Sequence, residues 1–396
     1  MENNVKIGMF GYGCVGQGLH DVLLSSRGFK SDIKKICVKD RTKPRRISSD
    51  NFTFDKDVIL NDPEINLVVE LISDAEEAYH IVKRALSSGK NVVTANKKML
   101  ADHLPELIKL QDEHKVSLLY EAACCGCIPI IRNLEEYYDN ELLFAVSGIF
   151  NGSSNFILSK MYNERLDYAT ALKQAQDLGF AEADPSLDVD GIDAKNKLAI
   201  ITGHAYGLFL NPDDVFHFGV SKVSTFDLQF AREKQMKLKL VPSVYKVGEQ
   251  MVALEVMPRF VTANQFLFNV EDEYNGVIAE AAFSNQQFFY GKGAGGHPTG
   301  SAVLSDISAN SYGYRYEYKK LFQHNETSFT RNVDYEIYVR YKHEADLEPI
   351  GLKSISESFK GKDFNYVIGV ANLETLYANR EAIYGRELFM AQLPTK

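Results

Sequence analysis

The sequence lacks any apolar run of the roughly 18 residues that a membrane-spanning helix requires. It opens with MENNVKIGMF, and the apolar stretch in this segment is too short for a secretory signal. No internal repeat and no low-complexity tract interrupts the chain. We therefore expect a cytoplasmic globular protein with no membrane partner.

The chain also lacks the basic surface that a nucleic-acid-binding protein needs. Its formal net charge is −9, and its one basic cluster, VKDRTKPRR at 38–46, is not continued by a basic stripe with interleaved aromatic residues. We expect no nucleic-acid partner, and small-molecule chemistry is the better interpretation.

Cysteines are few and odd in number. The five cysteines include three in CCGC at 124–127, a pattern that does not form a secreted disulfide framework. Cys124 and Cys127 form a C-x-x-C, but no second C-x-x-C and no paired histidines complete a zinc site. The sequence therefore favours a reduced compartment and a packing role for these thiols.

A glycine-rich turn near the N-terminus predicts a dinucleotide site. The chain has 396 residues, enough for two or three domains, and its first segment alternates apolar residues from Val5 to Phe10. Gly11, Gly13 and Gly16 follow as G-x-G-x-x-G, and helical apolar spacing begins directly after them. Glycines at these positions permit a tight turn and a close approach of backbone to a pyrophosphate.

The next segments predict a doubly wound parallel sheet and a cofactor. Strand-like runs occur at NLVVELIS (66–73), NVVTANK (91–97) and VSLLYEAA (116–123), with helical spacing between them. A second strand, KKICVKD, is expected to end at 39–40. Lys39, Arg41 and Lys43 near its tip favour the 2′-phosphate of NADP(H), while NAD(H) stays open as the alternative.

The middle of the chain contains an acidic segment followed by two lysines. In AEADPSLDVDGIDAKNKLAI (181–200), Asp193 and Lys197 are four residues apart on one face of a predicted helix. Their apolar neighbours indicate that this pair is not fully solvated. Residues 250–290 alternate apolar and polar residues, which is typical of half-exposed antiparallel strands.

Six segments together resemble homoserine dehydrogenase, which interconverts L-homoserine and L-aspartate 4-semialdehyde. The resemblance covers roughly residues 5–310, and the segments occur in the order and spacing of the family. They are GYGCVG, VVTANKK, EAACCGCIPII, GIFNGSSNFI, GFAEADPSLDVDGIDAKNKLAI and GKGAGGHPTGSAVLSD. The acidic segment with its lysine is the most diagnostic of the six.

The resemblance implies an α/β fold: a Rossmann-type doubly wound parallel sheet, an inserted α+β substrate and dimerisation domain, and a small C-terminal α+β unit. We expect the dinucleotide-binding domain at 1–129 plus about 298–322 and the substrate-binding domain at 130–297. Residues 323–396 would form the small unit, either a degenerate regulatory domain or an oligomerisation element. The family resemblance also implies a homodimer or homotetramer.

The resemblance assigns roles to residues in these motifs. Lys197 would exchange the hydroxyl proton, with Lys97 as the second active-site lysine and Lys98 as its alternative. The substrate-binding residues would be Glu182, Asp188, Asp193, Gly152 and Ser153, with serine at 153 where the family has threonine. The cofactor-binding residues would be Gly11, Tyr12, Gly13, Cys14, Val15, Gly16, Lys39, Thr94, Lys97 and Gly293.

The family also binds a monovalent cation, usually sodium. The matching ligands are the carboxylate of Glu121 and the backbone carbonyls of Cys124, Gly126 and Ile128. The family usually has glycine where Cys125 and Cys127 stand. If these positions need positive φ, cysteine carries a steric cost there.

Two alternatives stay open at this stage. Aspartate-semialdehyde dehydrogenase shares a Rossmann domain but forms a thioester on a cysteine, for which Cys125 or Cys127 would be the candidates. A requirement for phosphate during NADPH formation would identify it. The other alternative is a non-catalytic NADPH-binding sensor, against which the intact Glu182, Asp193 and Lys197 argue.

Overall fold

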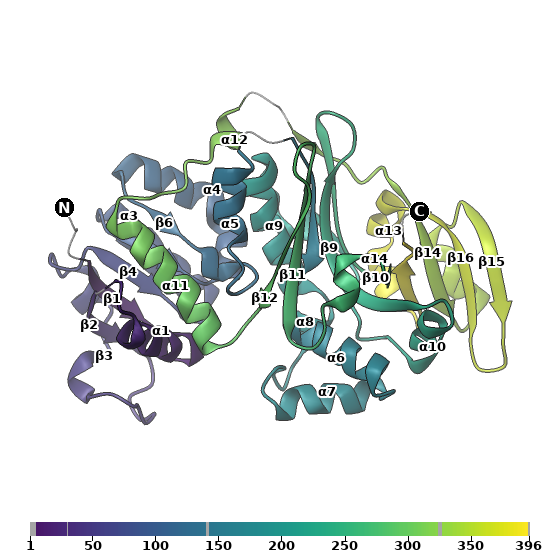
Figure 1. Ribbon diagram of the computed structural model, residues 1–396, viewed down its shortest axis with the longest axis horizontal. Coiled ribbons are helices and arrows are strands. Elements are labelled where there is room, and N and C mark those ends of the chain that lie inside the picture. The colour runs from purple at the N-terminus through teal and green to yellow at the C-terminus, as the bar shows by residue number, and fades with distance from the viewer. Residues whose placement is uncertain (1–4, 30, 140–141, 324–326, 395–396) are drawn as a thin grey trace. The chain divides into compact units, whose positions relative to one another are not determined.

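The computed structural model describes residues 5–29, 31–139, 142–323 and 327–394, and its chain divides into two units (Figure 1). The first unit comprises Met1–Asn140, Ala199–Phe209 and Gly291–Gln323, and the second comprises Glu141–Leu198, Leu210–Tyr290 and His324–Lys396. Among the described residues, no helix is long and apolar enough to cross a membrane.

The first unit contains a six-stranded sheet in the order β3-β2-β1-β4-β5-β6, with every pair parallel. Its strands are β1 (Lys6–Phe10), β2 (Asp32–Cys37), β3 (Phe52–Thr53), β4 (Leu67–Glu70), β5 (Asn91–Thr94) and β6 (Leu118–Leu119). All four residues of β4 are buried, as the continuous apolar run predicted. The predicted doubly wound parallel sheet is confirmed, and its chain order reverses between β1 and β4.

The helices of the first unit lie between these strands, except for the last three, which follow β6 in the chain. They are α1 (Cys14–Ser25), α2 (Asp57–Leu60), α3 (Ala75–Ser87), α4 (Lys97–His114), α5 (Ile130–Arg132), α11 (Gly296–Ser311) and α12 (Lys319–Phe322), with irregular turns at Ser49–Asn51, Glu121–Ala123 and Asn133–Tyr137. Helix α1 packs closely on α11 because glycines meet there: a β carbon on Gly18 would lie 1.9 Å from the carbonyl oxygen of Gly296.

The second strand ends earlier than its sequence indicated. β2 stops at Cys37, whereas we expected it to continue to residues 39–40. The carboxylate of Asp40 accepts hydrogen bonds from the backbone amides of Thr42 (2.7 Å) and Lys43 (3.2 Å), which folds the chain into a turn at this point. Such a turn competes with continuation of the strand.

The second unit is built on a mixed sheet in the order β12-β11-β7-β9-β10-β17-β14-β16-β15, with β8 and β13 paired to β10. Its strands are β7 (Leu143–Ile149), β8 (Phe216–His217), β9 (Met236–Lys246), β10 (Met251–Thr262), β11 (Tyr274–Ala281), β12 (Asn285–Lys292), β13 (Ser328–Phe329), β14 (Asp334–Tyr341), β15 (Ser354–Lys360), β16 (Asn365–Asn372) and β17 (Phe389–Gln392). The expected strands within 250–290 are therefore present.

The predicted half-exposure of these strands is wrong for β10. Most of β10 is buried because both of its faces are covered. Val261 packs into a core with Leu267 and Val270, while Val256 on the opposite side lies against Gly191. In contrast, β12 forms one end of the sheet, and its residues are exposed or partly buried.

The helices of the second unit carry most of the predicted substrate residues. They are α6 (Gly152–Asn163), α7 (Tyr168–Asp177), α8 (Ser186–Val189), α10 (Thr225–Glu233), α13 (Leu373–Ala378) and α14 (Arg380–Tyr384), with 3-10 turns at Pro212–Asp214, Phe266–Asn269 and Glu344–Ile350. Helix α9 (Ile192–Tyr206) begins in this unit and continues into the first.

The C-terminal strands β14 to β17 share the sheet of the second unit. Arg259 of β10 pairs with Gln392 of β17, and β17 pairs with β14. These strands are therefore hydrogen-bonded into the same sheet as β10. That residues 323–396 form a separate unit stays a prediction.

Candidate active site

The turn between β1 and α1 needs glycine at its first position. Gly11 has a φ of +94°, and a β carbon there would lie 2.6 Å from the carbonyl oxygen of Leu71. A β carbon on Gly16 would lie 2.6 Å from the carbonyl oxygen of Gly11. Both positions therefore hold the backbone closer than any side chain allows.

Gly13 differs from its two partners because it borders open space. No atom lies within 4 Å of the position that its β carbon would occupy, and no side chain caps the N-terminus of α1, which begins at the next residue. The first-turn amides of a helix lack intrahelical acceptors and carry partial positive charge. The turn thus has the room and the donors that a dinucleotide pyrophosphate requires.

Other predicted cofactor residues surround this turn. Tyr12 is buried and packs edge-on against Phe52, with 5.2 Å between the ring centroids, whereas Cys14 is exposed and Val15 is partly buried. Lys39 is exposed in the loop after β2. In the same loop, the guanidinium of Arg45 lies 4.8 Å from the ring centroid of Phe52, so a cation–π contact holds the loop against β3.

The carboxyl ends of β4 and β5 are joined by a buried hydrogen bond. The hydroxyl of Thr94 donates to Glu70 (2.5 Å), and the other carboxylate oxygen of Glu70 accepts from the amide of Ile72 (2.6 Å). Burial raises the pKa of Glu70 to about 7. The sequence analysis did not single out Glu70, although its place as the only charged residue of NLVVELIS was a signal.

The two lysines at the start of α4 differ in their surroundings. Asn96 caps the helix by accepting from the amide of Met99 (3.0 Å). Lys98 is exposed and pairs with Asp102 at 2.7 Å on the helix surface. Lys97 is partly buried. Because Lys97 is less exposed to solvent than Lys98, it is the better candidate of the two.

In the second unit, Lys197 lies in a buried polar cluster. Its ammonium Nζ is 2.8 Å from Oδ2 of Asp193, one turn earlier on α9, and it donates to the carbonyl oxygen of Phe150 at 2.7 Å. Lys197 is 7% exposed and Asp193 is 5% exposed, so the ion pair is protected from solvent. The prediction that this pair is not fully solvated is confirmed.

Asn151 links this pair to Asp188, and the sequence analysis missed it. The side-chain amide nitrogen donates to Oδ1 of Asp188 (2.7 Å) and to Oδ2 of Asp193 (2.9 Å), while its oxygen accepts from the amide of Ser154 (2.8 Å) and caps α6. An asparagine directly before a small polar turn was the available signal for the cap. Its contacts with the acidic segment could not be read from that motif.

The remaining predicted substrate residues lie on α6 and on the acidic loop. Gly152 and Ser153 occupy the first positions of α6, and the hydroxyl of Ser153 donates to the carbonyl oxygen of Phe180. Glu182 is exposed, and its carboxylate makes no hydrogen bond or ion pair with other residues in the part of the chain that the structure describes. The structure therefore brings together Asp188, Asp193 and Lys197, but not Glu182.

The predicted cation loop is strained at one cysteine. Cys125 has a φ of +56°, in the left-handed region that costs a side-chain-bearing residue roughly 1 kcal/mol or more. The next residue, Gly126, has a φ of +63°, and a β carbon there would lie 2.5 Å from the carbonyl of Gly293. Cysteine therefore stands at position 125 where the backbone favours glycine, as the sequence analysis anticipated, whereas Cys127 does not have a positive φ.

Glu121 at the start of this loop is buried with a second carboxylate. Its two oxygens accept from the amides of Ile131 (2.7 Å) and Arg132 (2.9 Å), and its own amide donates to Asp306 (2.8 Å). Burial, and then the neighbouring Asp306, raise the pKa of Glu121 to about 8. Among the described residues, no cluster of three or more His, Cys, Asp or Glu side chains could hold a metal ion.

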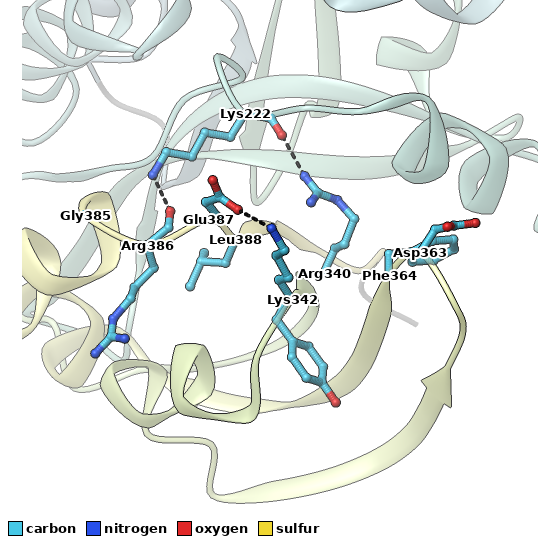
Figure 2. A pocket seen from close by; sticks show the side chains of 10 residues that line it. Lys222, Arg340, Lys342, Asp363, Phe364, Gly385, Arg386, Glu387 and Leu388 are labelled. Atoms are coloured by element: carbon cyan, nitrogen blue, oxygen red, sulfur yellow. Dashed lines mark hydrogen bonds and ion pairs between the residues drawn. The ribbon is translucent and has the colours of Figure 1, made fainter.

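A pocket of about 560 Å³ lies in the second unit, and none of its lining residues is a predicted site residue (Figure 2). Lys222, Arg340, Lys342 and Arg386 line it together with two acidic residues, Asp363 and Glu387. Carboxylates already pair with three of the cations: Asp227 with Arg340 (2.9 Å), Glu387 with Lys342 (3.4 Å) and Asp346 with Arg386 (3.8 Å). The fourth, Lys222, donates to the carbonyl of Tyr384 and to that of Arg386, the second of which Figure 2 shows. The pocket therefore has little surplus charge for a ligand.

Comparison with known proteins decides the family. The sequence model described as homoserine dehydrogenase matches residues 129–308, and the one described as its NAD binding domain matches residues 11–121. The homoserine dehydrogenase of Lactococcus lactis is 37% identical over 314 residues, which cover 76% of this chain and 73% of that protein. The chain belongs to the homoserine dehydrogenase family.

Solved homoserine dehydrogenases share the whole fold. The enzyme from Thiobacillus denitrificans aligns with a TM-score of 0.85 at 28% identity and covers 100% of this chain and 99% of its own. The Staphylococcus aureus enzyme aligns with a TM-score of 0.74 at 30% identity and covers 100% of both chains. A hyperthermophilic archaeal homoserine dehydrogenase mutant solved with NADPH covers 80% of this chain with a TM-score of 0.68.

Membership of the homoserine dehydrogenase family establishes the reaction class. The chain is a nicotinamide-dependent oxidoreductase that acts on an alcohol group of a small-molecule substrate, and the thioester and sensor alternatives are not favoured. The residues of the glycine turn fit such a cofactor, because the space beside Gly13 and the uncapped N-terminus of α1 suit its pyrophosphate.

Proposed function

We propose that Lys197 transfers the hydroxyl proton of L-homoserine during its interconversion with L-aspartate 4-semialdehyde. The observation that supports this role is the geometry of its amine, which is held by Asp193 at 2.8 Å and by the carbonyl oxygen of Phe150 at 2.7 Å. Both contacts fix the position of the amine beside the acidic segment that is proposed to bind the substrate.

The proton and hydride balance follows from this placement. A nicotinamide cofactor, when bound, would supply the acceptor for the hydride of the alcohol carbon. The hydroxyl proton passes to neutral Lys197 as the carbonyl forms, and in the reverse direction the Lys197 ammonium protonates the developing alkoxide. Asp193 stabilises the charged form of the lysine. Lys97 is the second proposed active-site lysine.

The substrate is an amino acid, and two kinds of group are proposed to hold it. Asp188 and Asp193 place two carboxylates beside Lys197, and carboxylates are the groups that would bind the substrate ammonium. Glu182 would add a third carboxylate. The amides of Gly152 and Ser153 begin α6, where first-turn N–H groups favour the substrate carboxylate.

We propose NADP(H) as the preferred cofactor, with NAD(H) as the alternative. Lys39, Arg41 and Lys43 in the loop after β2 are all exposed, and they supply the positive charge that a 2′-phosphate requires. The acidic side chain in this loop, Asp40, binds the backbone of Thr42 and Lys43. Because Asp40 is already bonded within that turn, it is less suited to bind the ribose hydroxyls of NAD.

We also propose that a monovalent cation, such as sodium, binds at Glu121 and the carbonyls of Cys124, Gly126 and Ile128. Two buried carboxyl groups, Glu121 and Asp306, are balanced here by a single guanidinium, that of Arg132 (2.7 Å from Asp306). A cation would offset the excess negative charge. Each oxygen of Glu121 accepts one amide and keeps a lone pair for such an ion.

The proposed oligomer is a homodimer or homotetramer. The second unit exposes large apolar side chains at the start of β7, where Leu142 is 54% and Phe144 44% exposed, and between β11 and β12, where Phe283 is 81% exposed. Exposed apolar side chains of this size are typical of protein interfaces.

The test is reduction of NADP⁺ by purified protein with L-homoserine, in the presence and absence of phosphate. We expect turnover without phosphate and a lower KM for NADP⁺ than for NAD⁺. Glu182→Gln should raise the KM for homoserine, while Asp184→Asn, in the same exposed loop and bonded to the amide of Ser186 (3.1 Å), should leave it unchanged. Dependence on phosphate, or equal effects of the two variants, would contradict the proposal.

A further inference from the structure

Asn151 makes more contacts with the proposed catalytic cluster than any helix cap needs. It is 6% exposed and stands between β7 and α6, directly after Phe150, whose carbonyl oxygen accepts from Lys197. One two-residue turn therefore contacts Lys197 through its backbone and the two carboxylates through its side chain.

The orientation of this amide is fixed by its neighbours. The amide of Ser154 can only donate, so it faces the side-chain oxygen of Asn151. The two carboxylates can only accept when ionised, so the NH₂ group faces them. Both N–H bonds of that group are then used, one to Asp188 (2.7 Å) and one to Asp193 (2.9 Å).

We propose that Asn151 is a positioning residue that holds Asp188 and Asp193 together as one ammonium site and keeps Asp193 aligned on Lys197. The inference rests on the proposed function of that cluster. Two carboxylates repel each other, and a neutral donor between them allows both to stay ionised. Oδ2 of Asp193 accepts from Asn151 and from Lys197 at once, so loss of the amide releases the partner of the lysine.

Two substitutions separate this role from helix capping. Asn151→Ser and Asn151→Asp both keep a residue that caps helices about as well as asparagine, so the stability of α6 should change little. Serine cannot supply two donors to the carboxylates. Aspartate supplies one donor when it is protonated and none when it is ionised. A matched control is Asp167→Asn, which exchanges the cap of α7 (2.8 Å to the amide of Thr170).

The experiment measures kcat and KM for homoserine from pH 6 to pH 9, with NADPH binding and thermal unfolding as controls. Asn151→Ser should lower kcat/KM by about 100-fold, through both a higher KM and a lower kcat, because two hydrogen bonds to charged groups are lost. Its melting temperature and NADPH affinity should stay near those of the wild type. Asp167→Asn should leave all of these values unchanged.

The pH profile of Asn151→Asp gives the decisive result. Asp188 and Asp193 beside the new carboxyl group favour its protonated form, which alone can donate. Its activity relative to the wild type should therefore rise as the pH falls from 9 to 6. A flat ratio, or wild-type kinetics for Asn151→Ser, would overturn the positioning role. If Lys197→Ala were inactive in the same assays, the proposed function would survive that outcome.

Discussion

Replacing Gly13 by alanine should weaken binding of the cofactor while leaving the fold intact. The added methyl group points into open space, since no atom lies within 4 Å of it, and the φ of −80° is accessible to alanine. Exchange of glycine for alanine at an uncapped helix start costs less than about 1 kcal/mol. If the space belongs to a pyrophosphate, the methyl group displaces it from the amides of α1, and NADPH affinity should fall at least about tenfold.

Gly18→Ala should have the opposite effect, because it should lower the stability of the fold without entering the cofactor space. Its β carbon would lie 1.9 Å from the carbonyl oxygen of Gly296, so α1 and α11 must separate. Overpacking of this kind costs ~1–3 kcal/mol, or a fall in Tm of roughly 2–10 °C for a domain of this size. Thermal unfolding without cofactor and fluorescence titration with NADPH measure the two effects. Wild-type NADPH affinity in Gly13→Ala would refute the assignment of this space to the cofactor.

Three further predictions concern the cofactor loop and two buried groups. Lys39→Ala should weaken NADP(H) more than NAD(H), by ~1–3 kcal/mol for a charge-assisted phosphate contact, and equal losses in paired titrations would remove the basis for NADP(H). Cys125→Gly should keep activity, because relief of the φ of +56° offsets the lost packing; complete loss of turnover in a folded variant would favour a thioester mechanism. Burial raises the pKa of Glu70 to about 7 from an ordinary value of 4.5, so its contribution to stability falls as pH rises from about 5 to 8. Glu70→Gln should remove this pH dependence. The same change of unfolding free energy with pH in both proteins, measured by calorimetry, would count against the prediction.

The sequence was informative wherever the determinants are local. The glycine turn could be predicted because Gly11, Gly13 and Gly16 act within one strand-turn-helix unit, and the Asp193–Lys197 pair could be predicted because both residues share one helix. The parallel order of the first sheet followed from alternating strands and helices.

Long-range contacts could not be predicted in the same way. Asn151 bonds to carboxylates 37 and 42 residues away, and nothing in its own motif indicates them. The pairing of β10 with β17 joins segments that lie far apart in the chain, with Glu255 and Gln392 separated by 137 residues. The early end of β2 depends on a side chain, Asp40, that bonds to its own backbone instead of continuing the strand.

The central claim is that Lys197 moves the proton, and the turnover of Lys197→Met tests it most directly. Methionine keeps the length of the side chain but cannot exchange a proton. A matched control exists on the same helix: Lys195 is also buried (6% exposed), and it pairs with Asp213 at 3.0 Å.

With saturating homoserine and NADP⁺, kcat of Lys197→Met should fall by roughly 10²–10⁴, the usual contribution of a positioned acid–base group, while its NADPH affinity stays unchanged. Lys195→Met should retain most of its activity. Turnover of Lys197→Met near the wild-type rate would contradict the account and would make Lys97 the leading candidate.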